Sequence, residues 1–499
     1  MKSYQLAALA LAAVGTLAFG ASKKAPAELG NVLYIGDSIT HGFGAPSYRW
    51  ELHKILVDNG VSYTEIGIET GNHSNGVEPG TSYIGVPFKN VHAAASGERA
   101  YEVSNRKHDS QRLDESSVFH WLGFEKDAAG EEVKPIDKRK LESVPDTCFI
   151  MLGTNDTLSD YGDKGGIAKN LLAAEKALLD KKKGDIPVIV NALRQKNPKM
   201  RIVMLTVPTW YDRATNSTEK DYQAIVKKYN KKLMNAFKRE TVVDVNQGLV
   251  DICSDKPLRA VKGFFNGDAL HPSVQGNIII AAQVARAMGY AGRSAGAPRK
   301  AASTFGLKAA NLLESASEKE GVAAAGDGLS LKAGGKMVSA WPEGSAAAKG
   351  FTVELQMNVG NGATEGWQKD GNVVLSIGNG EHSGQLKLAE GYILWNENTV
   401  LYPTNMADKK VEPIRVMWVN GSELHHVSKG FYVWYGDMLI GEGLPDDGAK
   451  FNGIGLANVS AKDEVVKFIS AEDAPAAPAT KNMVVEETQV VYDEEAAKQ

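Results

Sequence analysis

Ser38 lies in a stretch of the chain whose residue types suit attack on a carbonyl carbon. The stretch NVLYIGDSITHGFG, residues 31–44, contains an apolar run of the length that a buried strand needs, and Gly36 stands between that run and the serine. A serine just after a strand, close to a small residue, lies on a sharp strand-to-helix turn that lifts its hydroxyl to the edge of a sheet. Ser38 is therefore a candidate nucleophile, and the alternative is that it only caps the next helix.

The groups that a serine nucleophile needs are found far downstream. His271 lies in the stretch GDALHP, residues 267–272, just before a predicted helix, and Pro272 suits the first helical position. Asp268 precedes His271 by one turn of chain, so the carboxylate and the imidazole can meet. In a serine hydrolase the imidazole takes the hydroxyl proton and a carboxylate holds the imidazole in the correct tautomer. We therefore expect Asp268 and His271 to serve Ser38.

Two further residues are candidate hydrogen-bond donors to an oxyanion. Asn155 follows a predicted strand in the stretch GTND, residues 153–156, which places its amide at the edge of the sheet where Ser38 emerges. Its alternative role is that of a turn or cap asparagine. Gly97, in the stretch ASGE, has no side chain to block its backbone N–H, although the same residue would suit an ordinary loop.

The elements that must position these residues form an alternating pattern over residues 25–292. Strands alternating with amphipathic helices predict a parallel sheet covered on both faces. Two irregular segments, residues 69–90 and 104–146, interrupt the pattern, and we expect one of them to shape the rim of the site; a solvated loop is the alternative for the first. The expected strands are 32–35, 61–66, 147–152, 201–206 and 241–245, and the expected helices are 167–178 and 219–239.

The composition changes after this region. Residues 293–335 are rich in Ala, Gly, Ser and Lys and are expected to form a linker and the entry to a second domain. Residues 336–470 contain strand-like runs of period two separated by turn residues, which predict an antiparallel β-sandwich. Trp418 and Trp434 are expected in its core, and Trp367 is a candidate exposed contact. Residues 471–499 are expected to be a disordered acidic tail.

The N-terminal sequence indicates the localisation of the protein, and the net charge indicates which partners it is not expected to bind. Lys2 precedes an apolar run that ends in small residues, the layout of a signal peptide over residues 1–21, and the run is shorter than the roughly 20 residues of a spanning helix. We found no later apolar stretch long enough to cross a bilayer. The net charge of −4 and the absence of basic runs interleaved with aromatics argue against nucleic-acid binding. A secreted or periplasmic protein without a transmembrane segment is expected.

The two cysteines, Cys148 and Cys253, have no zinc-type spacing. An exported protein could join them in a disulfide. Cys148 lies in an apolar run, where a free thiol behaves as a small hydrophobic residue, and we favour two buried thiols.

Taken together and in order, the four stretches resemble the SGNH, or GDSL-type, hydrolases. GDSIT (36–40) resembles the first block of that family, SG (96–97) the second, GTND (153–156) the third and DALHP (268–272) the last; the residues HAAA before the second block depart from the usual pattern. The resemblance covers residues 31–290 and implies a flavodoxin-like three-layer α/β/α sandwich. It implies Ser38 as nucleophile, His271 as base oriented by Asp268, and an oxyanion hole made by the N–H groups of Ser38 and Gly97 and the side chain of Asn155. No metal or organic cofactor is implied.

The C-terminal region resembles the concanavalin-like or laminin-G-like sandwiches that are often appended to glycan-acting enzymes. Together the two resemblances predict an exported esterase that removes O-acetyl groups from an acetylated glycan, for example sialic acid, xylan or pectin, through an acyl-enzyme. One alternative is a lipase, lysophospholipase or thioesterase of the same fold. Another is a non-catalytic glycan-binding protein, against which the presence of Ser38, Asp268 and His271 argues.

Overall fold

A computed structural model defines the fold, and several expectations fall on residues that it does not describe. The predicted signal peptide, most of the expected helix 167–178, Cys253, Trp367 and the end of the expected tail all lie outside the described residues. The structure describes residues 25–83, 85–104, 116–157, 178–181, 183–209, 219–251, 259–260, 264–268, 270–290, 298–300, 306–326, 328–341, 350–357, 373–389, 392–396, 399–403, 413–419, 429–436, 438–461, 463–472 and 476–478.

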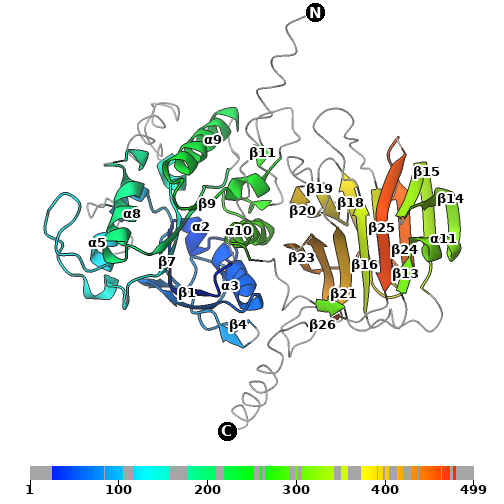
Figure 1. The fold of residues 1–499 in the computed structure, drawn as a ribbon, viewed down its shortest axis with the longest axis horizontal. Coiled ribbons are helices and arrows are strands. Elements are labelled where there is room, and N and C mark those ends of the chain that lie inside the picture. The colour runs from blue at the N-terminus through cyan, green and yellow to red at the C-terminus, as the bar shows by residue number, and fades with distance from the viewer. Residues whose placement is uncertain are drawn as a thin grey trace, which may run out of the picture.

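The N-terminal part of the described chain alternates strands and helices (Figure 1). Its strands are β1 (Glu28–Gly36), β2 (Ser62–Ile66), β3 (Glu69–Thr70), β4 (Ser82–Tyr83), β5 (Val86–Pro87), β6 (Val91–Ala94), β7 (Thr147–Met151), β8 (Arg201–Leu205), β9 (Thr241–Val243), β10 (Val250–Asp251) and β11 (Arg259–Ala260). Its helices are α2 (Ser38–His41), α3 (Tyr48–Asp58), α4 (Ala100–Ser104), α5 (Val118–Trp121), α6 (Thr154–Thr157), α8 (Asp185–Lys196), α9 (Glu219–Ala236) and α10 (Val274–Ala287), with 3-10 turns at Asp137–Arg139 and Val245–Gly248.

The main strands form one sheet in which β1 is central. β1 pairs in parallel with β2, β6 and β7, and β7, β8 and β9 continue the parallel order. The sheet runs in the order β3–β6–β1–β7–β8–β9, and β2 also pairs with β1. Of the parallel strands, β2–β1–β7–β8–β9 follow the order of a flavodoxin-like fold. In such a sheet the strand order reverses beside the first strand, and the crevice at the carboxyl ends of the strands there is the usual place for a ligand. The fold therefore directs attention to the residues that follow β1 and β7.

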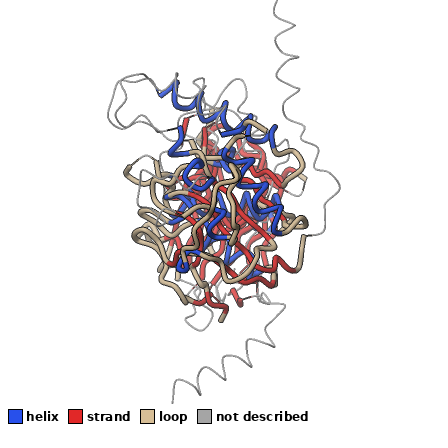
Figure 2. Tube along the Cα trace, turned by 90° about the vertical axis from the view of Figure 1, so that its left-hand side faces the viewer, coloured by secondary structure: helices blue, strands red, loops and turns tan. Residues whose placement is uncertain are grey.

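Both faces of this sheet are buried, which explains the apolar strands. Val32 and Tyr34 of β1 belong to one hydrophobic cluster, together with residues of α3 and α10. Leu33 and Ile35 belong to a second cluster, with residues of α8 and α9. Because successive side chains of a strand point to opposite faces, this division confirms the predicted three-layer α/β/α arrangement. Figure 2, which views the molecule from this end, shows the helices around the strands.

Cys148 lies within the second cluster. It is a free thiol and fully buried, and burial raises the pKa of its thiol. Its packing is that of a small hydrophobic side chain, as expected from the apolar run around it.

The C-terminal part of the described chain consists mainly of antiparallel strands, as predicted. They join into a 13-stranded hydrogen-bonded sheet within the described residues, and Trp418 and Trp434 are buried in it. A lectin-like sandwich remains a prediction for this region. Its elements are β12 (Pro298–Lys300), β13 (Gly306–Lys308), α11 (Ala309–Glu314), β14 (Ala316–Ala325), β15 (Gly328–Ser339), β16 (Gly350–Met357), β17 (Val373–Asn379), β18 (Ser383–Ala389), β19 (Tyr392–Trp395), β20 (Thr399–Pro403), β21 (Ile414–Val419), β22 (Gly430–Tyr435), β23 (Met438–Leu444), β24 (Asn452–Asn458), β25 (Glu464–Glu472) and β26 (Ala476–Pro478).

Regular structure extends beyond both expected limits of this region. The segment 293–335 contains β13 and β14 and the first part of β15, and these strands pair with the main antiparallel sheet. The expected tail begins within β25, and β26 pairs with β12. The alanine- and glycine-rich composition gave no strand pattern here, because the pairing of these strands is made by backbone hydrogen bonds to their neighbours rather than by β-propensity.

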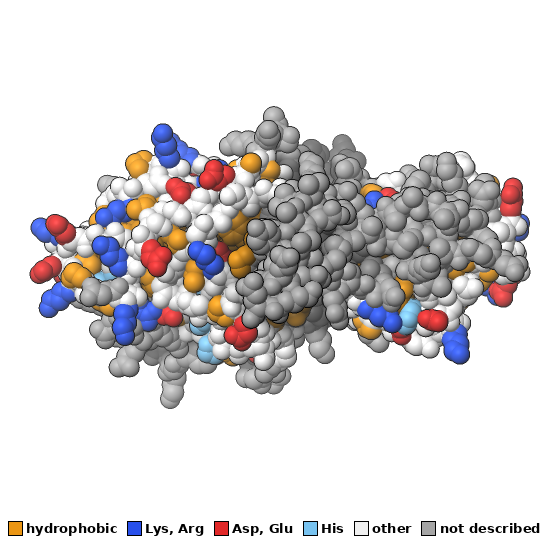
Figure 3. Space-filling model, turned by 90° about the horizontal axis from the view of Figure 1, so that it is seen from below, with side chains coloured by type: hydrophobic (Ala, Val, Ile, Leu, Met, Phe, Trp, Pro, Cys, Tyr) orange, Lys and Arg blue, Asp and Glu red, His pale blue; other side chains and the backbone are white. Residues whose placement is uncertain are grey.

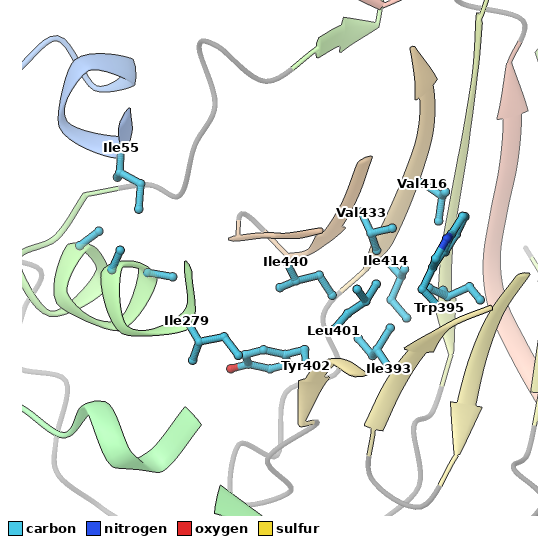
Figure 4. Packing of buried hydrophobic residues seen from close by; sticks show 14 of the residues in the cluster. Ile55, Ile279, Ile393, Trp395, Leu401, Tyr402, Ile414, Val416, Val433 and Ile440 are labelled. Atoms are coloured by element: carbon cyan, nitrogen blue, oxygen red, sulfur yellow. The ribbon is translucent and has the colours of Figure 1, made fainter. Parts of the chain in front are cut away.

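The two parts of the molecule share an apolar contact (Figure 4). Ile279 of α10 faces Tyr402 of the C-terminal sheet, and both belong to one buried cluster. The Gln275 side-chain amide donates to the carbonyls of Leu401 and Ile440 at 2.7 and 2.6 Å. The C-terminal sheet therefore packs on the helix that follows His271.

On one face of the molecule, the described side chains are mixed in charge (Figure 3). On the face drawn in Figure 3, Lys and Arg side chains alternate with Asp and Glu side chains, so neither sign gathers in one patch there. Among the helices of the described residues, none combines the length and the apolar character needed to cross a bilayer.

Candidate active site

Ser38 is the first residue of the short helix α2, directly beyond the carboxyl end of β1. Gly36 is required before it, because a Cβ at this position would lie 2.1 Å from Thr40 Oγ1 and 2.9 Å from the carbonyl of Met151. Asp37 caps the helix by accepting a 3.0 Å hydrogen bond from the N–H of Ile39. Asp37 is therefore the helix cap, which leaves the Ser38 hydroxyl available for another partner.

The loop before α10 holds Asp268 and His271 in a compact turn. Asp268 Oδ1 accepts hydrogen bonds from the N–H groups of Leu270 and His271 at 3.0 and 2.9 Å. The second carboxylate oxygen, Oδ2, lies 2.6 Å from His271 Nδ1. The expectation that Pro272 begins the helix was wrong: α10 starts at Val274, after Ser273, whose hydroxyl accepts from the N–H of Gly276.

The structure brings these two distant segments together. Ser38 Oγ lies 2.7 Å from His271 Nε2. Because the carboxylate of Asp268 can only accept at Nδ1, the neutral imidazole carries its proton on Nδ1 and leaves Nε2 free to accept from the Ser38 hydroxyl. The three side chains thus form a continuous chain from hydroxyl to carboxylate, in the arrangement that activates a serine.

Electrostatics favour the ionised form of Asp268. Partial burial raises the pKa of this carboxyl, but the N–H groups of His271 and Leu270, followed by the His271 ring, outweigh that effect. The net result is a pKa below the ordinary value. A carboxylate that stays ionised stabilises the imidazolium that forms when His271 takes a proton.

Gly97 and Asn155 follow the two strands next to β1, at the same edge of the sheet. Gly36 pairs with Ala94 of β6 and with Met151 of β7, so the three following loops leave the sheet at one level. Gly97 has a φ of +83°, a conformation that favours glycine. Asn155 Nδ2 donates to the carbonyl of Glu98 at 2.9 Å, which ties these two loops together. That bond uses one of the two amide hydrogens and leaves the other available to a ligand.

Two buried carboxyls lie beside these candidate site residues. Burial raises the pKa of Asp37 to about 6, while the N–H of Ile39 acts in the opposite direction. Burial likewise raises the pKa of Asp156 to about 7, while the N–H of Ala100, which bonds its Oδ2 at 3.0 Å, lowers it. Burial therefore disfavours the negative charge of both carboxyls, which neighbour the residues expected to face an oxyanion.

The sequence analysis missed the residues that cover His271. The ring of Phe43 stacks on the His271 ring, with centroids 4.3 Å apart and planes 25° apart. Asn266 fixes both loops: its N–H donates to the His271 carbonyl at 2.7 Å and its side-chain amide donates to the Phe43 carbonyl at 3.2 Å. Phe43 lies within the stretch that contains Ser38, but nothing in its spacing indicated a contact with a residue so far along the chain.

No group of three or more His, Cys, Asp or Glu side chains among the described residues could hold a metal ion.

Most of the parallel sheet and the segments of Ser38, Asp268 and His271 lie within one stretch of the chain that matches a known family. Residues 34–278 match the model of the GDSL-like lipase/acylhydrolase family, and this domain of the chain belongs to that family. No curated protein matches the chain.

Solved structures that are similar to the chain include two carbohydrate esterases. One is a carbohydrate esterase family 3 protein from Talaromyces cellulolyticus, with 19% identity over 51% of this chain and 94% of that chain and a TM-score of 0.32. Another is a family 3 carbohydrate esterase of Clostridium thermocellum, with 19% identity over 52% of this chain and 94% of that chain and a TM-score of 0.31.

Proposed function

We propose that this protein is a serine esterase with Ser38 as its nucleophile. The observation that carries the proposal is the 2.7 Å contact between Ser38 Oγ and His271 Nε2, with Asp268 Oδ2 at 2.6 Å from the opposite nitrogen of the ring. Membership of the acylhydrolase family agrees with this chemistry.

The reaction follows from the positions of these groups. As Ser38 Oγ forms a bond to the ester carbonyl carbon, its proton passes to His271 Nε2, and Asp268 stabilises the imidazolium. The tetrahedral intermediate collapses when the same proton passes to the leaving alcohol oxygen, and the acyl group remains on Ser38. Water then attacks the acyl-enzyme, giving its proton to His271, and the carboxylic acid is released while the Ser38 hydroxyl is restored.

The oxyanion of the tetrahedral intermediate needs donors, and we assign this role to the N–H groups of Ser38 and Gly97 and the Asn155 amide. Replacement of Asn155 by alanine should lower kcat on an activated acetyl ester by about 10²-fold, because one donor is lost where charge develops. Steady-state kinetics of the purified variant measure this effect. A change of less than about threefold would assign the donor to another group.

Within this class, we propose the removal of small O-acyl groups, acetyl above all, from carbohydrate. The loops next to Ser38 and His271 carry polar side chains, His41 in the helix of Ser38 and Asn266 in the loop before His271, and these support a polar substrate. Residues 1–21 are proposed to be a signal peptide that directs the protein out of the cytoplasm, where glycans are accessible.

A series of model esters separates this proposal from the lipase and thioesterase alternative. The wild-type protein should hydrolyse acetyl esters faster than octanoyl esters of the same alcohol, and it should release acetate from acetylated xylan, pectin or sialic acids. A rate that rises with chain length would favour the lipase alternative. Binding of glycan without turnover of any ester would favour the non-catalytic alternative.

A further inference from the structure

The side chain of Gln275 joins the hydrolase domain to both ends of the C-terminal sheet. Its amide nitrogen donates to the carbonyl of Leu401 in β20 at 2.7 Å and to the carbonyl of Ile440 in β23 at 2.6 Å. In the strand order of that sheet, β20 stands first and β23 stands last. The sheet therefore curves until these end strands approach each other, and the two hydrogens of one amide group bridge them.

The junction of the two end strands, at Leu401 and Ile440, lies inside the molecule. End strands of a sheet present backbone groups that a neighbouring strand does not pair. Leu401 and Ile440 are both fully buried, so their carbonyls have to find donors within the protein. Gln275 supplies donors to both from the first turn of α10, where its side chain is half-buried. A residue of the hydrolase domain thus closes the junction.

The same turn of α10 also holds the loop that carries His271. The side-chain amide of Asn277 donates to the carbonyls of Pro272 and Ser273 at 3.2 and 3.1 Å. The Ser273 hydroxyl accepts from the N–H of Gly276 at 3.2 Å. Pro272 directly follows His271, so a shift of this turn moves the backbone that carries the imidazole.

Other contacts hold the two parts of the molecule together away from this turn. Ile279, one turn further along α10, faces Tyr402 in a buried apolar cluster (Figure 4). On α3, the Lys54 ammonium lies 3.2 Å from the Glu442 carboxylate of β23. Loss of the Gln275 amide would therefore release the first turn of α10 while the C-terminal sheet stays in contact with both helices.

We propose that Gln275 is a positioning residue for His271, and that the C-terminal sheet thereby takes part in the proposed catalysis. The 2.7 Å contact between Ser38 Oγ and His271 Nε2 needs an accurate placement of the ring, because a misplacement of about 1 Å can cost about 10²-fold in rate. Asp268 and Asn266 hold the His271 loop from the hydrolase side. Gln275 holds it from the side of the sheet. This role rests on the proposed function and adds to it a residue outside the reacting groups.

Gln275→Met tests this role, because methionine is similar in size and suits a helix but donates no hydrogen bond. Its kcat on p-nitrophenyl acetate should fall about 10-fold with KM little changed, the effect of a ring displaced by less than 1 Å. Gln275→Ala, which removes the donors without adding bulk at the junction, should show the same loss. The far-UV circular dichroism of both variants should match that of the wild type.

Gln283→Met is the matched control, since Gln283 lies about two turns further along α10 and is likewise half-buried. This substitution should leave kcat and KM unchanged. The His271→Ala background separates positioning from a general loss of stability. There Gln275→Met should cause no further loss of the residual rate, because the ring that it positions is absent.

A folded Gln275→Met or Gln275→Ala variant with wild-type kcat would overturn the positioning role. An equal loss with and without the His271 ring would also overturn it. If the wild-type protein does not hydrolyse p-nitrophenyl acetate at all, the proposed esterase function itself fails, and the positioning role fails with it.

Discussion

Replacement of Ser38 by alanine should remove almost all hydrolysis of p-nitrophenyl acetate, with kcat falling about 10⁴- to 10⁶-fold. The variant keeps the imidazole and the oxyanion donors but has no oxygen that can form the acyl-enzyme. The residual rate would come from substrate binding and oxyanion stabilisation alone. Initial rates of the wild type and the variant, measured at equal protein concentration, give the ratio directly.

The control for this experiment is a test that the Ser38→Ala variant is folded. Ser38 is the first residue of a four-residue helix whose cap is Asp37, so the alanine variant retains the capping hydrogen bond to Ile39. Its far-UV circular dichroism should therefore match that of the wild type. Near-wild-type turnover by a folded variant would exclude Ser38 as the nucleophile.

Asp268→Asn should lower kcat about 10³- to 10⁴-fold with little change in KM. An asparagine oxygen can still accept from the N–H groups of Leu270 and His271, so the turn persists. Its side-chain NH₂, however, would face His271 Nδ1 as a donor, which favours the tautomer with the proton on Nε2. That tautomer cannot accept a proton from Ser38.

Asp127→Asn provides a matched control for this prediction. Asp127 Oδ1 accepts from the N–H groups of Ala129 and Glu131, both at 2.9 Å, in a turn that resembles the one around Asp268. This substitution should leave kcat unchanged. A loss of similar size in both variants would mean that Asp268 acts through the stability of its turn, and no loss in Asp268→Asn would remove it from the mechanism.

Much of the hydrolase domain could be predicted from the sequence because its strands are buried on both faces. The run Val32–Ile35 needs apolar residues on both sides of the sheet, and this gives a signal that does not depend on distant contacts. The contact between Asp268 and His271 is likewise local, since one turn of chain joins them. The contact with Ser38 follows from the shared edge of the sheet, and the catalytic roles of the three residues stay predictions.

The parts that could not be predicted depend on contacts between distant segments. Phe43 and His73 are in contact because the backbones of Gly42 and Gly44 form hydrogen bonds with the irregular segment 69–90. Such a contact leaves no periodic pattern in the sequence. The strands β14 and β15 carry many small and charged residues, so their pairing is visible only in the register of the sheet. The contacts of Gln275 could not be predicted either, because its hydrogen-bond partners lie far along the chain, in β20 and β23.

Covalent labelling with a fluorophosphonate tests the central claim most directly. The phosphorus of this reagent resembles an ester carbonyl, and displacement of fluoride by an activated serine oxygen leaves a stable adduct that peptide mass spectrometry can locate. We expect one adduct, on Ser38, whose formation parallels the loss of esterase activity and which the Ser38→Ala variant lacks. Complete inactivation with the adduct on another residue, or full activity after Ser38 has been modified, would contradict the claim.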